Sequence, residues 1–495
     1  MDERARQMST PTTTGPEGAA SRGRRAHARG WRRRLAWGLA LGSVVGGAGV
    51  GGAMLWSQGE APRRPAVAPA PGARAQAAVR GGVAAALPEL AELIGEQEAR
   101  VRSRPHDARS WAVLGAAYVE QGRRTADAAV LYPKADRALR ASLKARPRGN
   151  AEALVGLAAL ANARRDFRTA LEQGEAARKA APKQWTAYPQ LIDAYTGLGE
   201  YKKAQATLDQ LKKLHSGPAV KAWAAGVYRD RGWREDAAAA LSDAVAGASS
   251  PAEQAAWLER AGQLSWERGD REAALRQFQE AVRLDPDQRA AQAGQGRALA
   301  ALGRASEALS AYRVALAKQP SPGHALELGE LYESLGLTQA ARVEYDLLRT
   351  RVSQDEAGGV DQQLVLGQFE ADHGDAAAAV ARLRAEWRRQ PGIAVADALG
   401  WALHRAGDDR EALRYAMTAT DRVHGGAMRS APYTYHLGMI ERSLGRHGAA
   451  RRHLTEALRI NPYFSPLHAP TARAALAALG EPSMEDVPDF RPPRD

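Results

Sequence analysis

The sequence contains no cysteine among its 495 residues. This absence excludes a disulfide framework, thiolate catalysis, iron–sulfur ligation and cysteine zinc sites, although it leaves the cellular compartment open. Aromatic residues are scarce, at 6% with five Phe. So few bulky side chains would fill a large β-sandwich or a buried parallel sheet poorly, whereas the frequent Ala, Leu, Arg, Glu and Gln favour helices. We therefore predict an all-α protein.

The length indicates several domains or one long array, because a single domain usually takes roughly 100 to 200 residues. The net charge of +13 is unevenly placed. Residues 1–34 hold nine Arg against three acidic residues, which is +6 and leaves +7 for the other 461 residues. About half of the excess is thus confined to a short basic tail, and we do not expect nucleic-acid binding. The ten Lys against 59 Arg are typical of a GC-rich bacterial genome.

A hydrophobic stretch follows the basic tail. Residues 35–56 (LAWGLALGSVVGGAGVGGAMLW) carry no charge and would span about 33 Å as a helix, enough for a hydrocarbon core of about 30 Å. Seven Arg lie just before this stretch, and Arg63, Arg64, Arg74 and Arg80 follow it. The positive-inside rule then predicts a cytoplasmic amino terminus, a single uncleaved span in the cell membrane and an extracytoplasmic remainder. The alternative is a cleaved signal peptide and a secreted protein.

Three glycines in this stretch have the spacing found where two membrane helices approach closely. Gly38, Gly42 and Gly46 are four residues apart, so the span is a candidate for dimerisation. The alternative is that glycine is simply common in such spans. Residues 57–84 are rich in Ala and Pro without apolar periodicity, and we interpret them as a disordered linker.

An internal repeat occupies most of the remaining chain. Five positions that begin with Gly269 recur after a shift of 34 residues. The two aligned sets are Gly269, Ala274, Phe278, Ala281 and Pro286, then Gly303, Ala308, Tyr312, Ala315 and Pro320. Related patterns extend in both directions, which indicates a solenoid of stacked units.

The pattern resembles the tetratricopeptide repeat family, in particular membrane-anchored bacterial, actinobacterial-like members. The segment SWAVLGAAY provides Trp111, Leu114, Gly115 and Tyr118 at the family's first-helix positions. The second helix then continues with Ala135, Leu139 and Pro147, after about eight extra residues in the turn. The resemblance implies an α-solenoid of about ten helix-turn-helix units over residues 108–463.

Segments on either side of the repeats are predicted to close the two ends of the array, because no unit buries its apolar face alone. Residues 85–107 are predicted as an amino-terminal capping helix with Leu90, Leu93 and Val101 on its apolar side. Residues 464–480 are predicted to contain a carboxy-terminal capping helix, and residues 481–495 a disordered tail.

No catalytic motif is found. Gly294 and Gly296 begin a GxGxx pattern, but Leu299 occupies the third glycine position and no strand is expected before it. His404 and Asp408 are spaced to meet on one helix, which is typical of a surface contact rather than a metal site. We therefore predict a non-enzymatic protein without metal or cofactor.

The resemblance implies that the first helices line a concave groove, chiefly one, five and eight residues after the Trp-equivalent position. The predicted groove residues in the middle units are Asp193, Glu259, Gln263, Trp266, Arg297, Glu330, Glu333 and Gln368. Those in the last two units are Asp397, Trp401, His404, Tyr435, Met439 and Arg442. Aromatic residues, Met and Arg are enriched where proteins bind each other. The alternative for Trp401 and Tyr435 is that they pack between helices.

These features predict a membrane-anchored scaffold that binds partner proteins or peptides on its concave face. The alternative is an accessory or regulatory subunit of a cell-envelope enzyme or export machine.

Overall fold

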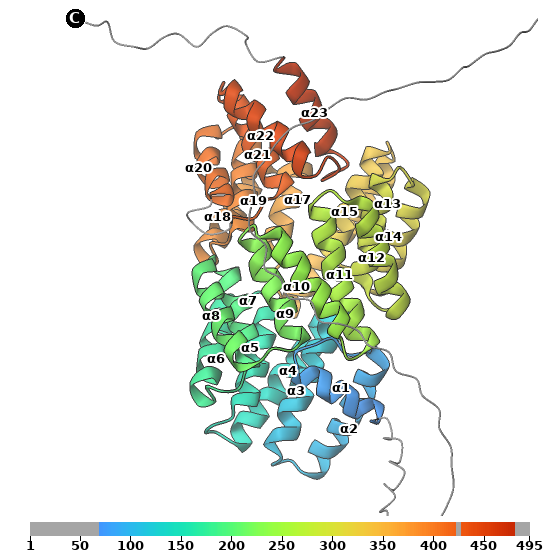
Figure 1. Ribbon diagram of the computed structural model, residues 1–495, viewed down its shortest axis with the longest axis vertical. Helices are drawn as coiled ribbons and strands as arrows, with labels where there is room; N and C mark the ends of the chain where they lie inside the picture. The colour runs from blue at the N-terminus through green and yellow to red at the C-terminus, as the bar shows by residue number, and fades with distance from the viewer. Residues whose placement is uncertain (1–68, 422–426, 481–495) are drawn as a thin grey trace, which may run out of the picture. The chain divides into compact units, whose positions relative to one another are not determined.

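The computed structural model describes residues 69–421 and 427–480, which all belong to one compact unit. This part of the chain contains helices and no strand (Figure 1), so the predicted all-α fold is confirmed there. The helices are α1 (Pro71–Arg80), α2 (Leu87–Ser103), α3 (Ala108–Thr125), α4 (Ala128–Ala145), α5 (Ala151–Ala163), α6 (Phe167–Ala180), α7 (Ala187–Gly197), α8 (Tyr201–Leu214), α9 (Pro218–Asp230), α10 (Arg234–Gly247), α11 (Pro251–Glu267), α12 (Arg271–Leu284), α13 (Arg289–Ala301), α14 (Ala305–Lys318), α15 (Pro322–Ser334), α16 (Thr338–Ala357), α17 (Gln363–His373), α18 (Ala376–Arg389), α19 (Ile393–Arg405), α20 (Asp409–Thr420), α21 (Ala431–Ser443), α22 (His447–Ile460) and α23 (His468–Ala478).

Helices α3 to α22 form ten successive helix pairs, in agreement with the predicted number of units. Between the two helices of most pairs, a glycine takes a positive φ, as at Gly199 and Gly303, where a side chain would be strained. Side-chain caps begin several helices; for example, the Asp270 carboxylate accepts a hydrogen bond from the Ala273 amide. In the first pair, the sequence predicts about eight extra residues in the turn. In the structure these residues lengthen the helices instead, and α3 and α4 each have 18 residues.

Small residues let the helices pack closely around one large side chain per unit. A methyl group at Gly262 would lie 2.6 Å from the Phe278 ring, and one at Gly294 would lie 2.5 Å from it. Gly296 faces the Tyr312 ring in the same way. Close packing thus explains the high Ala and Gly content, because the small residues make room for a ring such as Phe278 or for a leucine such as Leu383.

The amino-terminal end departs from the prediction in one helix. Helix α2 buries Leu90, Leu93 and Val101 as expected of a cap. Residues 71–80, however, form α1, so the prediction of a disordered linker over 57–84 is wrong for them. Pro71 suits the first turn of a helix, and Ala75 is fully buried where α1 packs against its neighbours. At the other end, α23 lies within the predicted carboxy-terminal cap.

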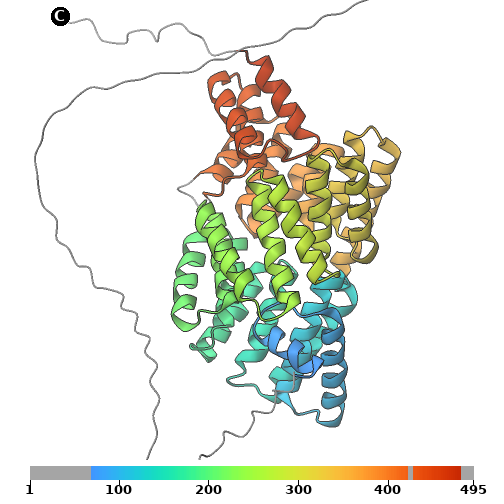
Figure 2. The same cartoon turned by 45° about the vertical axis from the view of Figure 1, so that its right-hand side comes forward.

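Distant repeats contact each other because the solenoid winds into a superhelix. In Figures 1 and 2, the orange and red helices α17–α22 lie beside the green helices α7–α11. Hydrogen bonds join these turns: Asn461 Nδ2 donates to the Trp266 carbonyl oxygen at 2.8 Å, and the Ile393 amide donates to the Tyr201 hydroxyl at 3.1 Å. We call this contact the seam. It is formed by Arg123–Ala126, Arg164–Arg168, Gly199–Tyr201, Gly232–Arg234 and Trp266–Gly269 on one turn, and by Asp285, Gln319, Arg351, Gly358–Asp361, Arg388–Ile393, Ala427–Arg429 and Ile460–Pro462 on the next.

Several sequence predictions concern residues outside the described part. The basic tail (1–34), the membrane span (35–56), the linker up to residue 68 and the tail after residue 480 lie there. Among the helices that the structure describes, none is long and apolar enough to cross a membrane.

Candidate functional site

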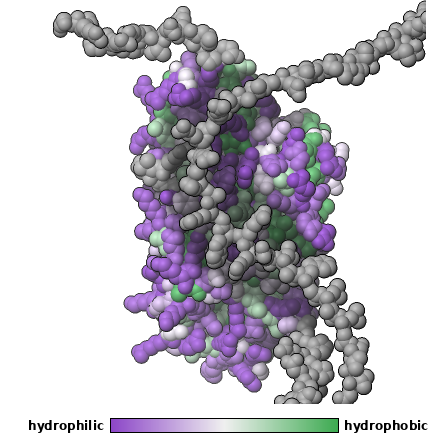
Figure 3. Space-filling view, viewed as in Figure 1, coloured by the Kyte–Doolittle hydropathy of each residue, from purple (hydrophilic) through white to green (hydrophobic). Residues whose placement is uncertain are grey.

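The first helices of the early repeats line three adjoining cavities, which we call the inner groove. The first cavity, of about 300 Å³, lies among α3, α5, α7 and α9, and α1 residues border it. The second, of about 370 Å³, lies among α7, α9 and α11. The third, of about 290 Å³, reaches the seam at Ile393. Asp193 and Trp223 line both the first and the second cavity. On the face shown in Figure 3, hydrophilic residues cover most of the surface and hydrophobic ones show mainly in recesses.

The first cavity is lined by an apolar wall and by polar side chains. Val113, Ala116 and Val119 of α3 and Val155 and Ala159 of α5 form this wall. Glu120, Asn162, Gln190 and Asp193 form the polar side. Ligand sites commonly combine an apolar surface with a few placed polar groups. The first cavity can therefore bind a chain that is apolar on one side and polar on the other.

Carboxylates outnumber guanidinium groups around the first two cavities, although the whole chain carries +13. The lining carboxylates are Glu120, Glu152, Asp193, Asp230 and Glu259, and the lining guanidinium groups are Arg80, Arg123, Arg229 and Arg260. Burial raises the pKa of Asp193 to about 7 and that of Asp230 to about 6, because the charged form loses solvation there. Burial also raises the pKa of Glu120 and Glu259.

The arginines of the groove already have partners. Arg229 forms a two-pronged ion pair with Glu267, with both N···O distances at 2.7 Å. The Arg260 guanidinium lies over the Trp223 and Trp257 rings, 5.3 and 4.9 Å from their centroids. Within residues 69–421 and 427–480, no hydrogen bond or ion pair reaches the carboxylate of Asp193 or Glu259. The groove thus holds partly buried carboxylates that lack a bonded counter-charge among the described residues.

Two further polar atoms of the first cavity are buried without a hydrogen-bond partner among the described residues: the Trp223 indole nitrogen Nε1 and the Asn162 side-chain oxygen Oδ1. The Asn162 amide is oriented by its nitrogen, which donates to the Gln190 carbonyl oxygen at 3.0 Å. Buried donors and acceptors are seldom left unpaired in proteins. One donor and one acceptor are therefore available to a bound molecule.

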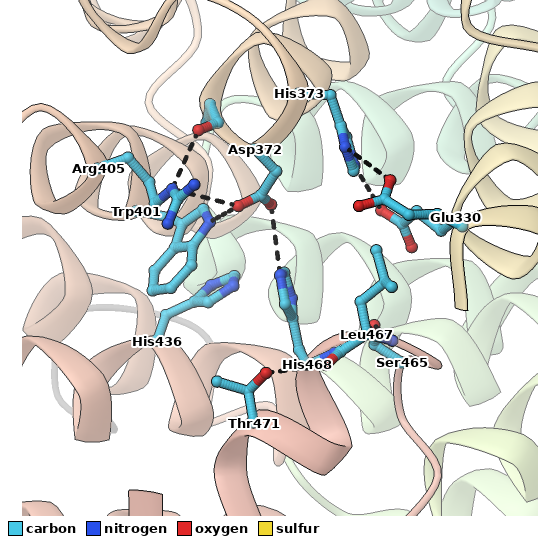
Figure 4. Close-up of polar contacts among 12 residues, drawn as sticks. Glu330, Asp372, His373, Trp401, Arg405, His436, Ser465, Leu467, His468 and Thr471 are labelled. Carbon is cyan, nitrogen blue, oxygen red and sulfur yellow. Dashed lines mark hydrogen bonds and ion pairs between the residues drawn. The ribbon is translucent and has the colours of Figure 1, made fainter. Parts of the chain in front are cut away.

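A second cluster lies near the carboxy-terminal end and is centred on Asp372 of α17 (Figure 4). The Trp401 indole donates to the Asp372 carboxylate at 2.9 Å, and His468 Nε2 lies 3.6 Å from it. The Trp401 ring stacks on His436, with centroids 4.3 Å apart, and His436 Nδ1 lies 2.9 Å from an Asp397 oxygen. The cluster is mutually bonded, so it fastens α23, α17 and α19 together.

Three of the groove residues predicted in the middle units line the cavities described above. Asp193, Glu259 and Gln263 line the inner groove. The Gln263 side-chain oxygen accepts a hydrogen bond from Arg297 at 2.6 Å. The Arg297 guanidinium lies 5.8 Å from the Trp266 ring centroid and also pairs with Glu327. Trp266 is itself buried.

The remaining predicted residues divide into buried and exposed ones. Tyr435 retains 1% of its surface and Trp401 5%, so both pack between helices, the alternative that the sequence left open. Asp397 is buried against His436, and Met439 is half-buried. His404 contacts Asp409, whereas Asp408 caps α20. Glu330 lies 3.7 Å from His373, Glu333 accepts a hydrogen bond from Tyr345, and Gln368 and Arg442 are exposed.

Sequence reasoning missed several groove residues. Trp223 and Arg260 lie on first helices but outside the offsets of one, five and eight residues, and Arg229 belongs to the fourth unit, for which no groove residue was predicted. Asn162 lies near the end of α5, a unit whose first helix has no tryptophan. An amphipathic reading of α9 and α11 would have placed Trp223 and Arg260 on the inner face. No group of three or more metal-ligating side chains occurs among the described residues.

Comparison with known proteins identifies the repeat. Residues 257–288 and 431–464 match the family model of the tetratricopeptide repeat. The chain contains tetratricopeptide repeats. The first match begins in α11 and extends through α12, and the second comprises α21 and α22. No curated protein matches the chain.

Solved structures with a similar arrangement of helices include two of human IFIT1. One is a dimer with PPP-AAAA, at 16% identity and a TM-score of 0.44, covering 63% of this chain and 72% of that one. The other is a dimer with m7Gppp-AAAA, at 17% identity and a TM-score of 0.44, covering 64% and 72%.

Proposed function

We propose that this protein is a non-catalytic scaffold that binds an extended segment of a partner protein in its inner groove. The composition of the first cavity carries this proposal: an apolar wall on α3 and α5 and unpaired polar atoms on α5 and α9 line the same cavity. An extended peptide presents side chains and backbone amide groups to opposite sides of such a groove. The stacked first helices α3, α5, α7 and α9 build it.

Nucleic acid fits this groove poorly. A phosphate backbone requires an excess of cations, whereas five carboxylates and four guanidinium groups line the first two cavities.

We further propose that residues 35–56 anchor the protein in a cell membrane with the repeats outside the cytoplasm. The uncharged stretch and the arginines before it support this proposal. Protease added to intact spheroplasts should degrade the repeats while a cytoplasmic marker survives. Repeats that survive until the membrane is lysed would contradict this orientation, and a repeat domain released into the medium would favour a cleaved signal.

The second candidate function is an accessory subunit of an envelope enzyme in the membrane. Crosslinking of the protein to one enzyme in a stoichiometric ratio would favour it.

The binding proposal is tested with a photo-crosslinking amino acid placed in the full-length protein. At Ala116, on the apolar wall of the first cavity, it should capture protein segments from native membranes. The matched control position is Val343 on α16, which is 64% exposed and lines none of the three cavities of the inner groove. Equal yields from both positions, or none from Ala116, would overturn the proposal.

A further inference from the structure

We propose that the junction of the first two cavities binds the cationic head of a lysine or arginine side chain on the bound segment. We define the junction by Asp193 and Trp223, which border both cavities, and include Glu259 of the second cavity. The inference rests on the proposed peptide binding and names which residue type the groove selects.

The carboxylates of Asp193 and Glu259 have arginines in their surroundings but no directly bonded cation among the described residues. Asp193 and Glu259 accept no hydrogen bond and form no ion pair with the described residues, as noted above. Arg260 and Arg123 stabilise the charged form of Asp193 without a direct ion pair; Arg123 lies 3.7 Å from Glu120, and the Arg260 guanidinium lies over the Trp223 ring. A buried carboxylate is costly unless it is paired. A cation placed at the junction would supply the missing pair.

The surroundings fit the rest of a basic residue as well as its charge. The aliphatic stem of lysine or arginine requires apolar contact, and Val119 and Ala116 provide it next to Asp193 in the first cavity. The Trp223 indole nitrogen can donate to a backbone carbonyl of the segment, and the Asn162 oxygen can accept from a backbone amide. The cavity thus offers a partner to the head, stem and backbone of one basic residue.

Other ligand classes satisfy fewer of these groups. An anion would meet the carboxylates of Asp193 and Glu259, and an uncharged side chain would leave them unpaired. The same ammonium chemistry occurs in a free polyamine, but a polyamine has no backbone carbonyl for Trp223 and no amide group equivalent to that of a peptide. A peptide source therefore uses more of the cavity, and the two sources can be separated by experiment.

The test measures binding of short capped Ala/Val peptides to the purified full-length protein by fluorescence anisotropy. The peptides carry one central residue: lysine, arginine, norleucine or glutamate. Norleucine retains most of the lysine stem without its charge. We expect the lysine and arginine peptides to bind at least about tenfold more tightly than the norleucine peptide, and the glutamate peptide to bind more weakly still.

Variants assign the effect to the junction. Asp193→Asn and Glu259→Gln keep the size of each side chain and should each reduce the preference for lysine over norleucine by about tenfold or more. Asp243→Asn is the matched control, because Asp243 lies on α10, 62% exposed, and pairs with Lys221. It should leave the preference unchanged. Circular dichroism verifies that each variant folds. Retained binding of the norleucine peptide verifies that the groove of the variant is intact.

Several outcomes would overturn the inference. Equal affinity for lysine and norleucine peptides would do so, as would an unchanged preference in both junction variants. Spermidine that binds as tightly as the lysine peptide and displaces it would assign the junction to a free polyamine. An oligoribonucleotide that displaces the peptide would assign the groove to nucleic acid.

Failure of the inference is distinguishable from failure of the proposed function. The segments captured at Ala116 are sequenced by mass spectrometry. Captured segments without a lysine or arginine near the crosslink would refute the basic-residue preference while peptide binding stands. No capture at all would refute peptide binding itself.

Discussion

Gly232 lies against the carbonyl oxygen of Ala427, so closely that a methyl group on Gly232 would lie 2.4 Å from it. The two residues are on successive turns of the superhelix. Gly199 has the same relationship with the carbonyl oxygen of Pro391, also at 2.4 Å. Glycine at these positions thus serves two needs, because φ is positive and the seam leaves no room for a side chain.

Substitution of these glycines is expected to open the seam. Gly199→Ala and Gly232→Ala should each lower the free energy of unfolding by about 1 to 2 kcal/mol for the positive φ, and by about 1 to 3 kcal/mol more for the clash. Gly303→Ala and Gly336→Ala are matched controls, because both have a positive φ but nothing within 4 Å of the added methyl group. Chemical denaturation gives the energies, and small-angle scattering should show expansion only for the seam variants. Equal effects in all four variants would mean that the seam contributes no constraint.

Binding of a basic peptide is expected to depend on pH through Asp193. With its pKa raised to about 7 by burial, ionised Asp193 increases from about 9% of molecules at pH 6 to about 91% at pH 8. The lysine peptide, which stays charged over this range, should therefore bind about tenfold more tightly at pH 8. Asp193→Asn should abolish the dependence, and an identical dependence in this variant would assign it to another group.

The same group affects stability with the opposite sign. Since the folded pKa of Asp193 is raised above its ordinary value, the unfolded state releases this proton first as pH rises. The free energy of unfolding should thus fall between about pH 4 and pH 7 in the absence of ligand. Asp193→Asn should flatten this part of the stability profile. Chemical denaturation at each pH, with Asp243→Asn as the control, measures it.

Tyr435 and Arg442 lie on the same helix, α21, and are expected to respond differently to substitution. Tyr435→Ala removes a fully buried ring and should lower the free energy of unfolding by about 3 to 5 kcal/mol. Arg442 is exposed, so Arg442→Ala should change stability by about 0.5 kcal/mol or less. Thermal denaturation followed by circular dichroism compares them. A stable Tyr435→Ala variant that loses partner binding would instead make Tyr435 a contact residue.

The attachment of α23 is expected to weaken in acid. Burial lowers the pKa of His468 to about 4, so the unfolded or detached state takes up this proton first as pH falls from about 6.5 to 4. Hydrogen exchange of residues 468–478 should accelerate in this range, after correction for the intrinsic effect of pH. His468→Gln should lack the acid-induced acceleration. If both proteins respond alike, a different group controls the attachment.

The repeat architecture was predictable from the sequence because it depends on local signals. The 34-residue shift that relates Gly269 to Gly303 arises from turns and close packing within each unit. The structure shows both features in these units. Helix α1 was missed because Pro71 and the prolines and glycines in the flanking sequence resemble a linker, whereas the helicity of α1 depends on packing against α2 and α3.

The inner groove was predictable only in part. Asp193, Glu259 and Gln263 were found by their offset from the Trp-equivalent position. Whether Tyr435 is buried depends on Phe464 and His468, which belong to the loop and helix after the last repeat. The seam joins residues 161 to 225 positions apart, and no single-unit pattern contains that information.

The seam ties the number of repeats to the pitch of the superhelix. In a simple solenoid, each unit interacts only with its neighbours, so units can be gained or lost singly. Here, deletion of one repeat between Trp266 and Pro391 would displace every later residue by one unit along the opposing turn. Gly199 and Gly232 would then meet backbone other than Pro391 and Ala427. The ten units are therefore expected to be kept or lost together. A change in the number of repeats should either add or remove a whole superhelical turn or abolish the seam.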